Sequence, residues 1–269
     1  MRMAVIGCGR MGTLHARKLA EMKDVDLVGV CDSDVAQAEF LGDKLGCDWF
    51  HRHGDLPALD AAVVATNPGS HGQVCDDLLN RVIHVLVEKP MAISEADARY
   101  MAETAEVNGL VLQVGHIERF NPVFKRMLVG IPFKIEADRH SPVSFRQFDV
   151  DVVLDLMIHD IDLVLSLAKT EVCKITGSGT RDIAVAELRF IDGSIATLRA
   201  NRKAKTRSRV WNVNDDKHYL LGEYDALQDE LRHFIDCVRN GEKPIVGGRD
   251  GAAALKIALE ISRQIREME

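Results

Sequence analysis

The chain has 269 residues, of which 28% are charged and 46% hydrophobic, and its formal net charge is −7. This length is enough for one or two domains with a sizeable core, and the negative charge argues against nucleic acid or a membrane surface as the partner of the whole protein. The sequence holds no apolar run of 18 residues, and it begins with a strand pattern rather than a charged-then-apolar signal segment, so we expect a cytoplasmic protein.

The cysteine and histidine content predicts no metal site. Six cysteines are spread along the chain without a C-x-x-C pair, which is typical of reduced thiols. His51 and His53 lie close together, but no Cys or acidic residue stands at ligand spacing beside them. We therefore expect a solvated loop there and no bound metal.

The N-terminal sequence joins an apolar strand to a glycine turn and then to an alanine-rich helix. The glycines have the spacing G-x-G-x-x-G, in which the first permits a tight turn, the second admits a pyrophosphate, and the third lets helix and strand touch. The helix N-terminus favours the anion through its N–H groups and its dipole. The predicted dinucleotide site comprises Gly7, Gly9, Arg10, Met11 and Gly12.

An acidic residue at the end of the second apolar strand supports the same prediction. Strand 25–31 ends at Asp32, twenty residues after Gly12, where a carboxylate can accept both hydroxyls of an adenosine ribose. Asp32 and Asp34 would repel a 2′-phosphate. The sequence therefore favours NAD over NADP as the cofactor.

The first part of the chain alternates strands with helices. The pattern predicts helices over 11–23, 33–45 and 70–80, a further helix capped by Ser94, and strands over 59–65, 82–87 and 110–114. Such alternation is typical of an α/β domain with a doubly wound parallel sheet, a Rossmann domain. Ligands of these sheets bind beyond the carboxyl ends of the strands.

The pattern changes after Gly115, and strands dominate. We expect strands over 133–139, 182–190 and 194–202, with a hairpin turn at Gly193, and helices over 152–168, 225–239 and 250–267. This composition predicts a C-terminal α+β domain with a mostly antiparallel sheet. The predicted domains are 1–118, which binds NAD, and 119–269, which binds the substrate and whose final helix can pack back on the first domain.

A lysine stands where the strand over 82–87 ends. Lys89 follows Glu88 and precedes Pro90, which restrains its backbone to an extended form. The strand end directs this lysine toward the place where a nicotinamide should lie. An exposed lysine at a strand end is common, so the position relative to the cofactor strand carries the prediction.

The helix over 151–168 is apolar on nearly all sides except for one polar stripe. At about 100° per residue, Asp155, His159, Asp162 and Ser166 fall on one face. A helix with this pattern is buried, and buried Asp and His side chains need partners or a wet cavity. The stripe is either part of a substrate cleft or a structural His–Asp network between domains.

With these motifs, the chain resembles the Gfo/Idh/MocA oxidoreductases. The matching residues are the three glycines, Ala65-Thr66-Asn67-Pro68 with His71, Glu88-Lys89-Pro90, and Asp155-x-x-x-His159-x-x-Asp162. The resemblance implies that Lys89 and His159 flank the sugar carbon being oxidised. It implies cofactor contacts from Thr66, Asn67, His71, Glu88, Lys89 and Pro90. Residues 114–122 and 149–162 are most similar to members that oxidise C3 of UDP-N-acetylglucosamine to a 3-keto sugar nucleotide, on the route to diamino-sugar lipid A.

The resemblance suggests how a secondary alcohol would lose its hydride and its proton. An imidazole, with an unperturbed pKa of about 6.5, suits proton transfer at neutral pH, so His159 is the preferred base. Asp155 would orient it or hold a sugar hydroxyl, and Lys89 would stabilise negative charge on the oxygen. The reverse assignment, with Lys89 as base, stays open.

Further residues are candidates for contacts with the rest of the substrate. Glu118, Arg119 and Asn121 follow the last strand of the first domain, although Arg119 could equally form a salt bridge between domains. Arg146 could hold a diphosphate by a bidentate contact. The basic stretch over 199–209 is expected to be a solvated strand face, or next a diphosphate contact or a subunit interface.

Two other functions stay open at this point. A dehydrogenase of the same family acting on a free polyol such as an inositol would share these motifs, and a non-catalytic NAD-sensing regulator would share the fold. The pair formed by Lys89 and His159 argues against the sensor. We expect a small-molecule partner and a homo-oligomer, either a dimer or a tetramer.

Overall fold

The computed structural model describes residues 1–127, 129–142, 150–220, 222 and 224–268. The chain divides into two compact units, and each is formed from more than one stretch of sequence. The first comprises Met1–Gly115 and Leu227–Ala252, and the second His116–Ala226 and Ala253–Glu269. The expected domains 1–118 and 119–269 stay a prediction. These compact units differ from them chiefly because 227–252 belongs to the first unit.

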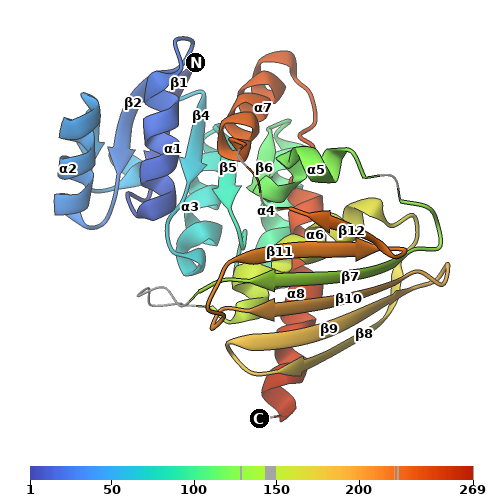
Figure 1. Cartoon of the computed structure of the whole chain (residues 1–269). Coiled ribbons are helices and arrows are strands. Elements are labelled where there is room, and N and C mark those ends of the chain that lie inside the picture. The colour runs from blue at the N-terminus through green and yellow to red at the C-terminus, as the bar shows by residue number, and fades with distance from the viewer. Residues whose placement is uncertain (128, 143–149, 221, 223, 269) are drawn as a thin grey trace. The chain divides into compact units, whose positions relative to one another are not determined.

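The first unit contains a six-stranded parallel sheet, as the sequence predicts (Figure 1). Its strands lie in the order β3-β2-β1-β4-β5-β6. Their bounds are β1 Arg2–Ile6, β2 Asp26–Cys31, β3 Asp48–Phe50, β4 Ala61–Val64, β5 His84–Glu88 and β6 Leu112–Gly115. The order reverses at β1 and β4, so the carboxyl ends of these two strands form the switch point at which such sheets bind ligands.

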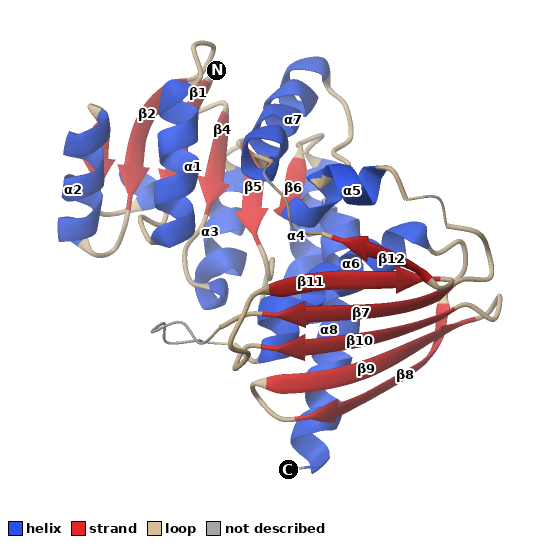
Figure 2. Cartoon of the chain, viewed as in Figure 1, coloured by secondary structure: helices blue, strands red, loops and turns tan. Residues whose placement is uncertain are grey.

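Helices cover both faces of this sheet. Chain order moves one way from β1 to β2 and the other way from β4 to β5, so right-handed crossovers place α1 and α3 on opposite faces. Figure 2 shows α7 on the same side as α1, and both helices contribute to one buried cluster with β1. The helices are α1 Arg10–Glu21, α2 Val35–Leu45, α3 Pro68–Asn80, α4 Glu95–Val107 and α7 Ala226–Asn240.

Local capping determines where two of these helices begin. The side chain of Asp34 accepts hydrogen bonds from the backbone of Ala36 and Gln37 at the start of α2. Ser94 accepts one from the backbone N–H of Asp97 at the start of α4, which confirms the predicted serine cap. Asp34 therefore has a structural role besides its charge near Asp32.

The second unit contains a mixed, mostly antiparallel sheet in the order β12-β11-β7-β10-β9-β8. Only the β10–β7 pair among these is parallel. The predicted hairpin turn is confirmed, with Gly193 at φ 87° between β9 and β10. The bounds are β7 Lys134–His140, β8 Val172–Gly179, β9 Ile183–Phe190, β10 Ile195–Asn201, β11 Ser208–Val213 and β12 Asp216–Tyr219.

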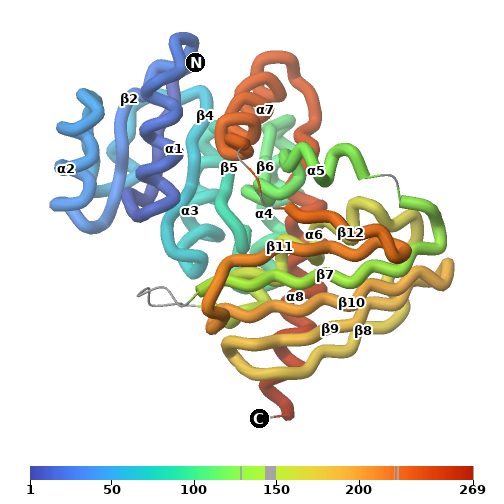
Figure 3. The backbone as a smooth tube through the Cα atoms, viewed as in Figure 1, coloured from blue at the N-terminus to red at the C-terminus, as the bar shows by residue number. Residues whose placement is uncertain are grey.

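Two long helices lie along one face of this second sheet (Figure 3). They are α6 Ile158–Leu167 and the part of α8 within this unit, α8 as a whole being Gly248–Met268. At Gly177 in β8, an added Cβ would lie 2.8 Å from a methyl carbon of Ile261, so strand and helix approach closely there. A short helix α5, Pro122–Lys125, precedes β7. No helix in the described part of the chain is long and apolar enough to cross a membrane.

The predicted helix over 152–168 is divided into two kinds of turn. Residues Val153–Met157 form a π-helix, and the α-helical part begins only at Ile158. The Asp151 side chain accepts hydrogen bonds from the backbone of Val153 and Leu154, both 3.1 Å. Short π-helices of this kind are rare and often occur at functional sites.

Candidate active site

The glycine turn of the first unit has room for a ligand at one glycine and none at the other two. Gly7 has φ +98°, and an added Cβ would lie 2.5 Å from the Ala65 backbone. At Gly12 it would lie 1.6 Å from the carbonyl oxygen of Gly7. At Gly9 it would meet no atom within 4 Å, so this backbone is open to an approaching group. These are the three roles that a dinucleotide-binding turn requires.

Asp32 is tied to the same turn. Its Oδ2 accepts a hydrogen bond of 2.6 Å from the backbone N–H of Cys8, and its Oδ1 accepts one of 2.8 Å from that of Asp34. Each carboxylate oxygen can still accept a further donor. The carboxylate at the end of β2 is therefore fixed in position and able to receive ribose hydroxyls.

A cavity of about 690 Å³ opens at the carboxyl ends of these strands. Its volume lies within the range of sites for small molecules and cofactors. The predicted cofactor residues that line it are Gly7, Gly9, Arg10, Met11, Asp32, Thr66, Asn67, His71, Glu88 and Lys89. His51 and His53 line it as well, and His53 Nε2 lies 2.8 Å from Asp77 Oδ2. The cavity brings the glycine turn and the strand-end lysine of this unit together.

His71 holds the strand ends in place from helix α3. Its Nδ1 lies 2.9 Å from the carbonyl oxygen of Pro90, and its Nε2 lies 3.1 Å from that of Thr66. The ring is fully buried, and burial lowers the pKa of His71, although the two carbonyl contacts act in the opposite direction. The Lys89–Pro90 peptide bond is cis, and the contact of His71 is with the carbonyl oxygen directly after it.

Glu88 is buried directly before Lys89. His15 Nε2 lies 2.7 Å from its Oε1, and the Lys89 backbone N–H donates to its Oε2 at 3.3 Å. Burial acts to raise the pKa of Glu88, but the His15 hydrogen bond and the charges of Lys89 and His71 outweigh it and lower the pKa. The residue before the strand-end lysine is thus a buried anion.

In the second unit, the predicted polar stripe belongs to more than one environment. The Asp162 carboxylate is buried and receives two hydrogen bonds from Arg119, of 2.6 and 2.9 Å. Asp155, in the π-helix, lies 4.0 Å from an Arg202 nitrogen. The His159 ring stands edge-on to that of His116, with ring centroids 6.1 Å apart. Ser166 bonds the carbonyl oxygen of Leu163 in its own helix.

Arg119 and Asp162 therefore form an ion pair within the second unit. The interdomain salt bridge considered from the sequence is not what Arg119 makes in the described part of the chain. Both carboxylate oxygens of Asp162 face the guanidinium, so this bidentate pair fixes the start of the unit against α6. A substrate contact of Arg119 stays a prediction.

A buried charge network lies beside this pair, and the sequence pattern gives no sign of it. Arg139 on β7 donates to Asp160 at 2.6 and 2.8 Å and to Glu118 at 3.0 Å. Trp211 donates to Asp160 at 2.9 Å, and Arg209 lies 2.6 Å from Glu118. Burial acts to lower the pKa of Arg139, but the charges of Asp160 and Glu118 outweigh it and raise the pKa.

The other candidate substrate residues have clear structural partners or cannot be described. The buried Asn121 side chain donates to Glu118, to the carbonyl oxygen of Leu220 and to the Tyr224 hydroxyl. Glu118 and Asn121 thus hold the second unit together, and their contact with substrate stays a prediction. Arg146 lies outside the described residues.

The basic stretch over 199–209 is largely paired with acidic groups of its own unit. Arg202 donates to Asp182 at 2.7 Å, and Arg199 lies within 3.8 Å of Asp138. Burial lowers the pKa of Arg209, whose side chain is about 29% exposed. The strand face expected for this stretch is wrong for 202–207, which connect β10 to β11, and only 199–201 and 208–209 lie on strands.

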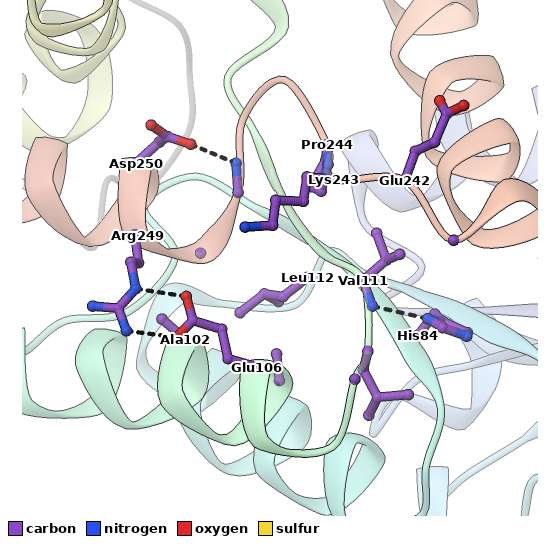
Figure 4. A pocket seen from close by; sticks show the side chains of 16 residues that line it. His84, Ala102, Glu106, Val111, Leu112, Glu242, Lys243, Pro244, Arg249 and Asp250 are labelled. Atoms are coloured by element: carbon purple, nitrogen blue, oxygen red, sulfur yellow. Dashed lines mark hydrogen bonds and ion pairs between the residues drawn. The ribbon is translucent and has the colours of Figure 1, made fainter.

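A second cavity, of about 620 Å³, lies at the opposite ends of β5 and β6 (Figure 4). Arg249 makes two hydrogen bonds to Glu106 at its rim, and the Val111 backbone N–H donates to His84. Lys243 also lines it. Ligands of doubly wound sheets bind beyond the carboxyl ends of the strands, so the first cavity is the candidate site for the cofactor.

Comparison with known proteins agrees with this geometry. The model of an oxidoreductase family with an NAD-binding Rossmann fold matches residues 1–116. The UDP-N-acetylglucosamine 3-dehydrogenase of Acidithiobacillus ferrooxidans is 33% identical over 97% of this chain and 96% of its own length. The chain belongs to the Gfo/Idh/MocA oxidoreductase family.

Solved structures and a second curated relative extend the comparison. The structure of the Acidithiobacillus ferrooxidans enzyme has a TM-score of 0.92 at 28% identity, covering 99% of this chain and 98% of that one. The myo-inositol 2-dehydrogenase of Thermotoga maritima is 25% identical over 99% of this chain and 97% of its own length. The expected family and fold class are confirmed.

The chain is an NAD-dependent dehydrogenase. The turn at Gly9, the carboxylate of Asp32 and the cavity that they line fit this cofactor. NAD supplies the hydride acceptor when it is bound. The individual site residues named from the sequence stay predictions.

Proposed function

We propose that this dehydrogenase oxidises the C3 hydroxyl of UDP-N-acetylglucosamine to a 3-keto sugar nucleotide. The observation that carries the proposal is the match to the Acidithiobacillus ferrooxidans 3-dehydrogenase, which extends over both compact units at 33% identity. The inositol dehydrogenases with similar coverage are 24–29% identical. The substrate of that nearer relative is therefore the first one to test.

The catalytic roles that we propose fall to Lys89 and His159. Lys89, at the end of β5 in the first cavity, hydrogen-bonds the reacting oxygen and stabilises its negative charge. His159, at the start of α6, takes the hydroxyl proton, and Asp155 orients it or holds a neighbouring hydroxyl. The reverse assignment of base and orienting group uses the same two residues.

The buried surroundings of Lys89 support this role. The anion of Glu88 lies directly behind its backbone, and His71 bonds the following Pro90. These contacts fix the backbone on both sides of Lys89, which lines the cavity, and a fixed attachment point favours electrostatic stabilisation of a reacting oxygen there. An ordinary exposed lysine has no such support.

The test is a scan of NAD reduction with UDP-sugars and free polyols, followed by mass spectrometry of the product. We expect reduction with UDP-N-acetylglucosamine and a product lighter by two hydrogen atoms. Reduction with an inositol and none with any UDP-sugar would refute the proposed substrate and leave the dehydrogenase activity standing.

A free-polyol dehydrogenase is the second candidate, because two inositol dehydrogenases match 99% of this chain. The same scan decides between the two. Placement of the reaction in the cytoplasm, ahead of an aminotransferase and diamino-sugar lipid A, follows from the sugar-nucleotide proposal and stands or falls with it. A homo-oligomeric state is also part of the proposal, and light scattering measures it.

A further inference from the structure

Three titratable side chains from three elements meet inside the first unit. They are His15 on α1, Glu88 at the end of β5 and Glu230 on α7. His15 and Glu230 are 0% exposed, and Glu88 is 7% exposed. One side-chain nitrogen or oxygen of each lies within 4.8 Å of the others. Glu230 has no part in the cofactor site described above.

The described hydrogen bonds of this cluster provide no donor for the carboxylate oxygens of Glu230. The described contacts of Glu88 are the His15 ring at Oε1 and the Lys89 backbone N–H at Oε2. Neither oxygen of Glu230 has a partner among the described residues, and neither has the Nδ1 of His15. An ionised carboxylate buried in this way costs several kcal/mol, so the Glu230 charge must be balanced or absent.

The geometry argues against a divalent cation as the balancing charge. Two ligand atoms at about 2.0–2.1 Å from a tetrahedral zinc ion stand roughly 3.3 Å apart. His15 Nε2 and Glu88 Oε1 are 2.7 Å apart, which is the length of a charged hydrogen bond with a proton between the atoms. The pair is therefore already joined by a proton, and Glu230 is left to be neutralised by another.

We propose that Glu230 is a buried neutral carboxylic acid that faces the Glu88 anion behind Lys89. A neutral carboxyl group has an O–H donor, and it supplies the hydrogen that this set of acceptors lacks. The proton belongs to Glu230 because Glu88 already receives two hydrogen bonds that favour its charged form.

The electrostatics of the cluster point the same way. Burial raises the pKa of Glu230 well above its ordinary value, and the charge of Glu88 raises it further. The groups that face Glu88 are His15 from α1, Lys89 from the strand end and His71 from α3. The Gln113 side chain on β6 donates to the backbone carbonyl of Glu230 at 3.1 Å and is uncharged.

The consequence for catalysis rests on the proposed role of Lys89. With Glu230 neutral, one anion stands behind the Lys89 backbone. With Glu230 ionised, two would crowd the same buried space and repel each other. Glu230 is therefore a positioning residue, which acts through Glu88 and touches neither substrate nor cofactor.

The test compares the pH dependence of unfolding in wild type and in Glu230→Gln, which is neutral at every pH and similar in shape. A group whose pKa is raised in the folded state contributes stability below its unfolded pKa and loses it as pH rises toward the folded pKa. Above about pH 5, we expect the wild-type unfolding constant to rise by up to tenfold per pH unit relative to that of the variant. Asp229→Asn, at an exposed acidic residue of the same helix, is the matched control and should follow wild type.

Two further measurements keep the proposal falsifiable. Infrared spectra at neutral pH should show a protonated carboxyl band that Glu230→Gln lacks, and metal analysis of the purified protein should find no stoichiometric divalent ion. Parallel pH profiles of wild type and variant would overturn the proposal, and so would a bound ion that the variant loses. None of these readouts uses turnover, so they are independent of the substrate scan.

Discussion

Gly9 and Gly12 lie three residues apart in the same turn, and the structure predicts opposite effects when each is changed to alanine. At Gly9 the added Cβ meets no atom within 4 Å, and the backbone, at φ −63° and ψ −166°, is acceptable for alanine. At Gly12 the added Cβ would lie 1.6 Å from the carbonyl oxygen of Gly7. Relieving this clash would require the backbone of the turn to shift. Gly9→Ala should therefore fold normally, and Gly12→Ala should not.

The magnitudes follow from these contacts. Gly9→Ala should change the free energy of unfolding by no more than about 0.5 kcal/mol, as surface substitutions do. If the pyrophosphate occupies the open space, the methyl group costs roughly 1–3 kcal/mol of overpacking on binding, which is a loss of about 5- to 150-fold in NADH affinity. Gly12→Ala should lose about 3 kcal/mol or more of folding stability.

Urea unfolding and fluorescence titration with NADH measure the two quantities separately. Each variant is a control for the other. Gly9→Ala should weaken NADH binding and leave stability unchanged, whereas Gly12→Ala should reduce stability. A Gly9→Ala protein that binds NADH as tightly as wild type would refute the assignment of this turn to the pyrophosphate.

Three further predictions concern charged groups. Arg139→Met should destabilise the protein by about 3–5 kcal/mol in urea, because it leaves Asp160 buried without its cation and Glu118 with Arg209 alone; a loss below 1 kcal/mol would contradict this. Two arginine partners lower the pKa of Asp24 from 3.8 to about 2, so it contributes stability above pH 4 that is lost as pH falls toward 2. The melting temperature of Asp24→Asn should therefore vary less over that interval than that of wild type. Lys89→Met should reduce turnover severely and leave NADH affinity nearly intact, and unchanged turnover would remove this lysine from the mechanism.

The first unit was predictable from the sequence because its elements follow local rules. Strand 59–65 is observed as Ala61–Val64 and strand 82–87 as His84–Glu88, so apolar runs placed each strand within two residues. Among the described strands of this unit only β3, Asp48–Phe50, was missed, since three residues are too few for a period to appear. The position of the cofactor cavity was predictable from topology, because the carboxyl ends of parallel strands all lie at the same edge of the sheet.

The second unit was less predictable because several of its strands lack a clear alternation. The predicted elements omit β8, β11 and β12. β12, Asp216–Tyr219, is a polar edge strand, and edges of sheets are commonly kept polar to prevent further pairing. β8 contains two glycines and is mostly exposed, so its sequence resembles a loop. β8 forms by pairing with β9, β12 by pairing with β11, and β11 by pairing with β7, and these partners are tertiary information.

The partners of buried charged residues were even less predictable from the sequence. A helical wheel placed Asp155, His159 and Asp162 on one stripe and left Asp160 aside. The π-helix at Val153–Met157 changes the phase of Asp155, and Asp160 is buried as well as Asp162 and is neutralised by Arg139. The partner lies 21 residues earlier on a strand, and no local period reports it.

This pattern has a physical reason that bears on function. Local rules detect groups that act through the backbone, such as the glycines and caps, because their geometry is set within a few residues. A buried ion needs a counter-charge from another element, so its partner is decided by the packing of the whole unit. Arg119 with Asp162, and Glu88 with His15, are both of this second kind. The sequence alone can therefore nominate Lys89 and His159 as reacting groups, but the groups that hold them in place come only from the folded chain.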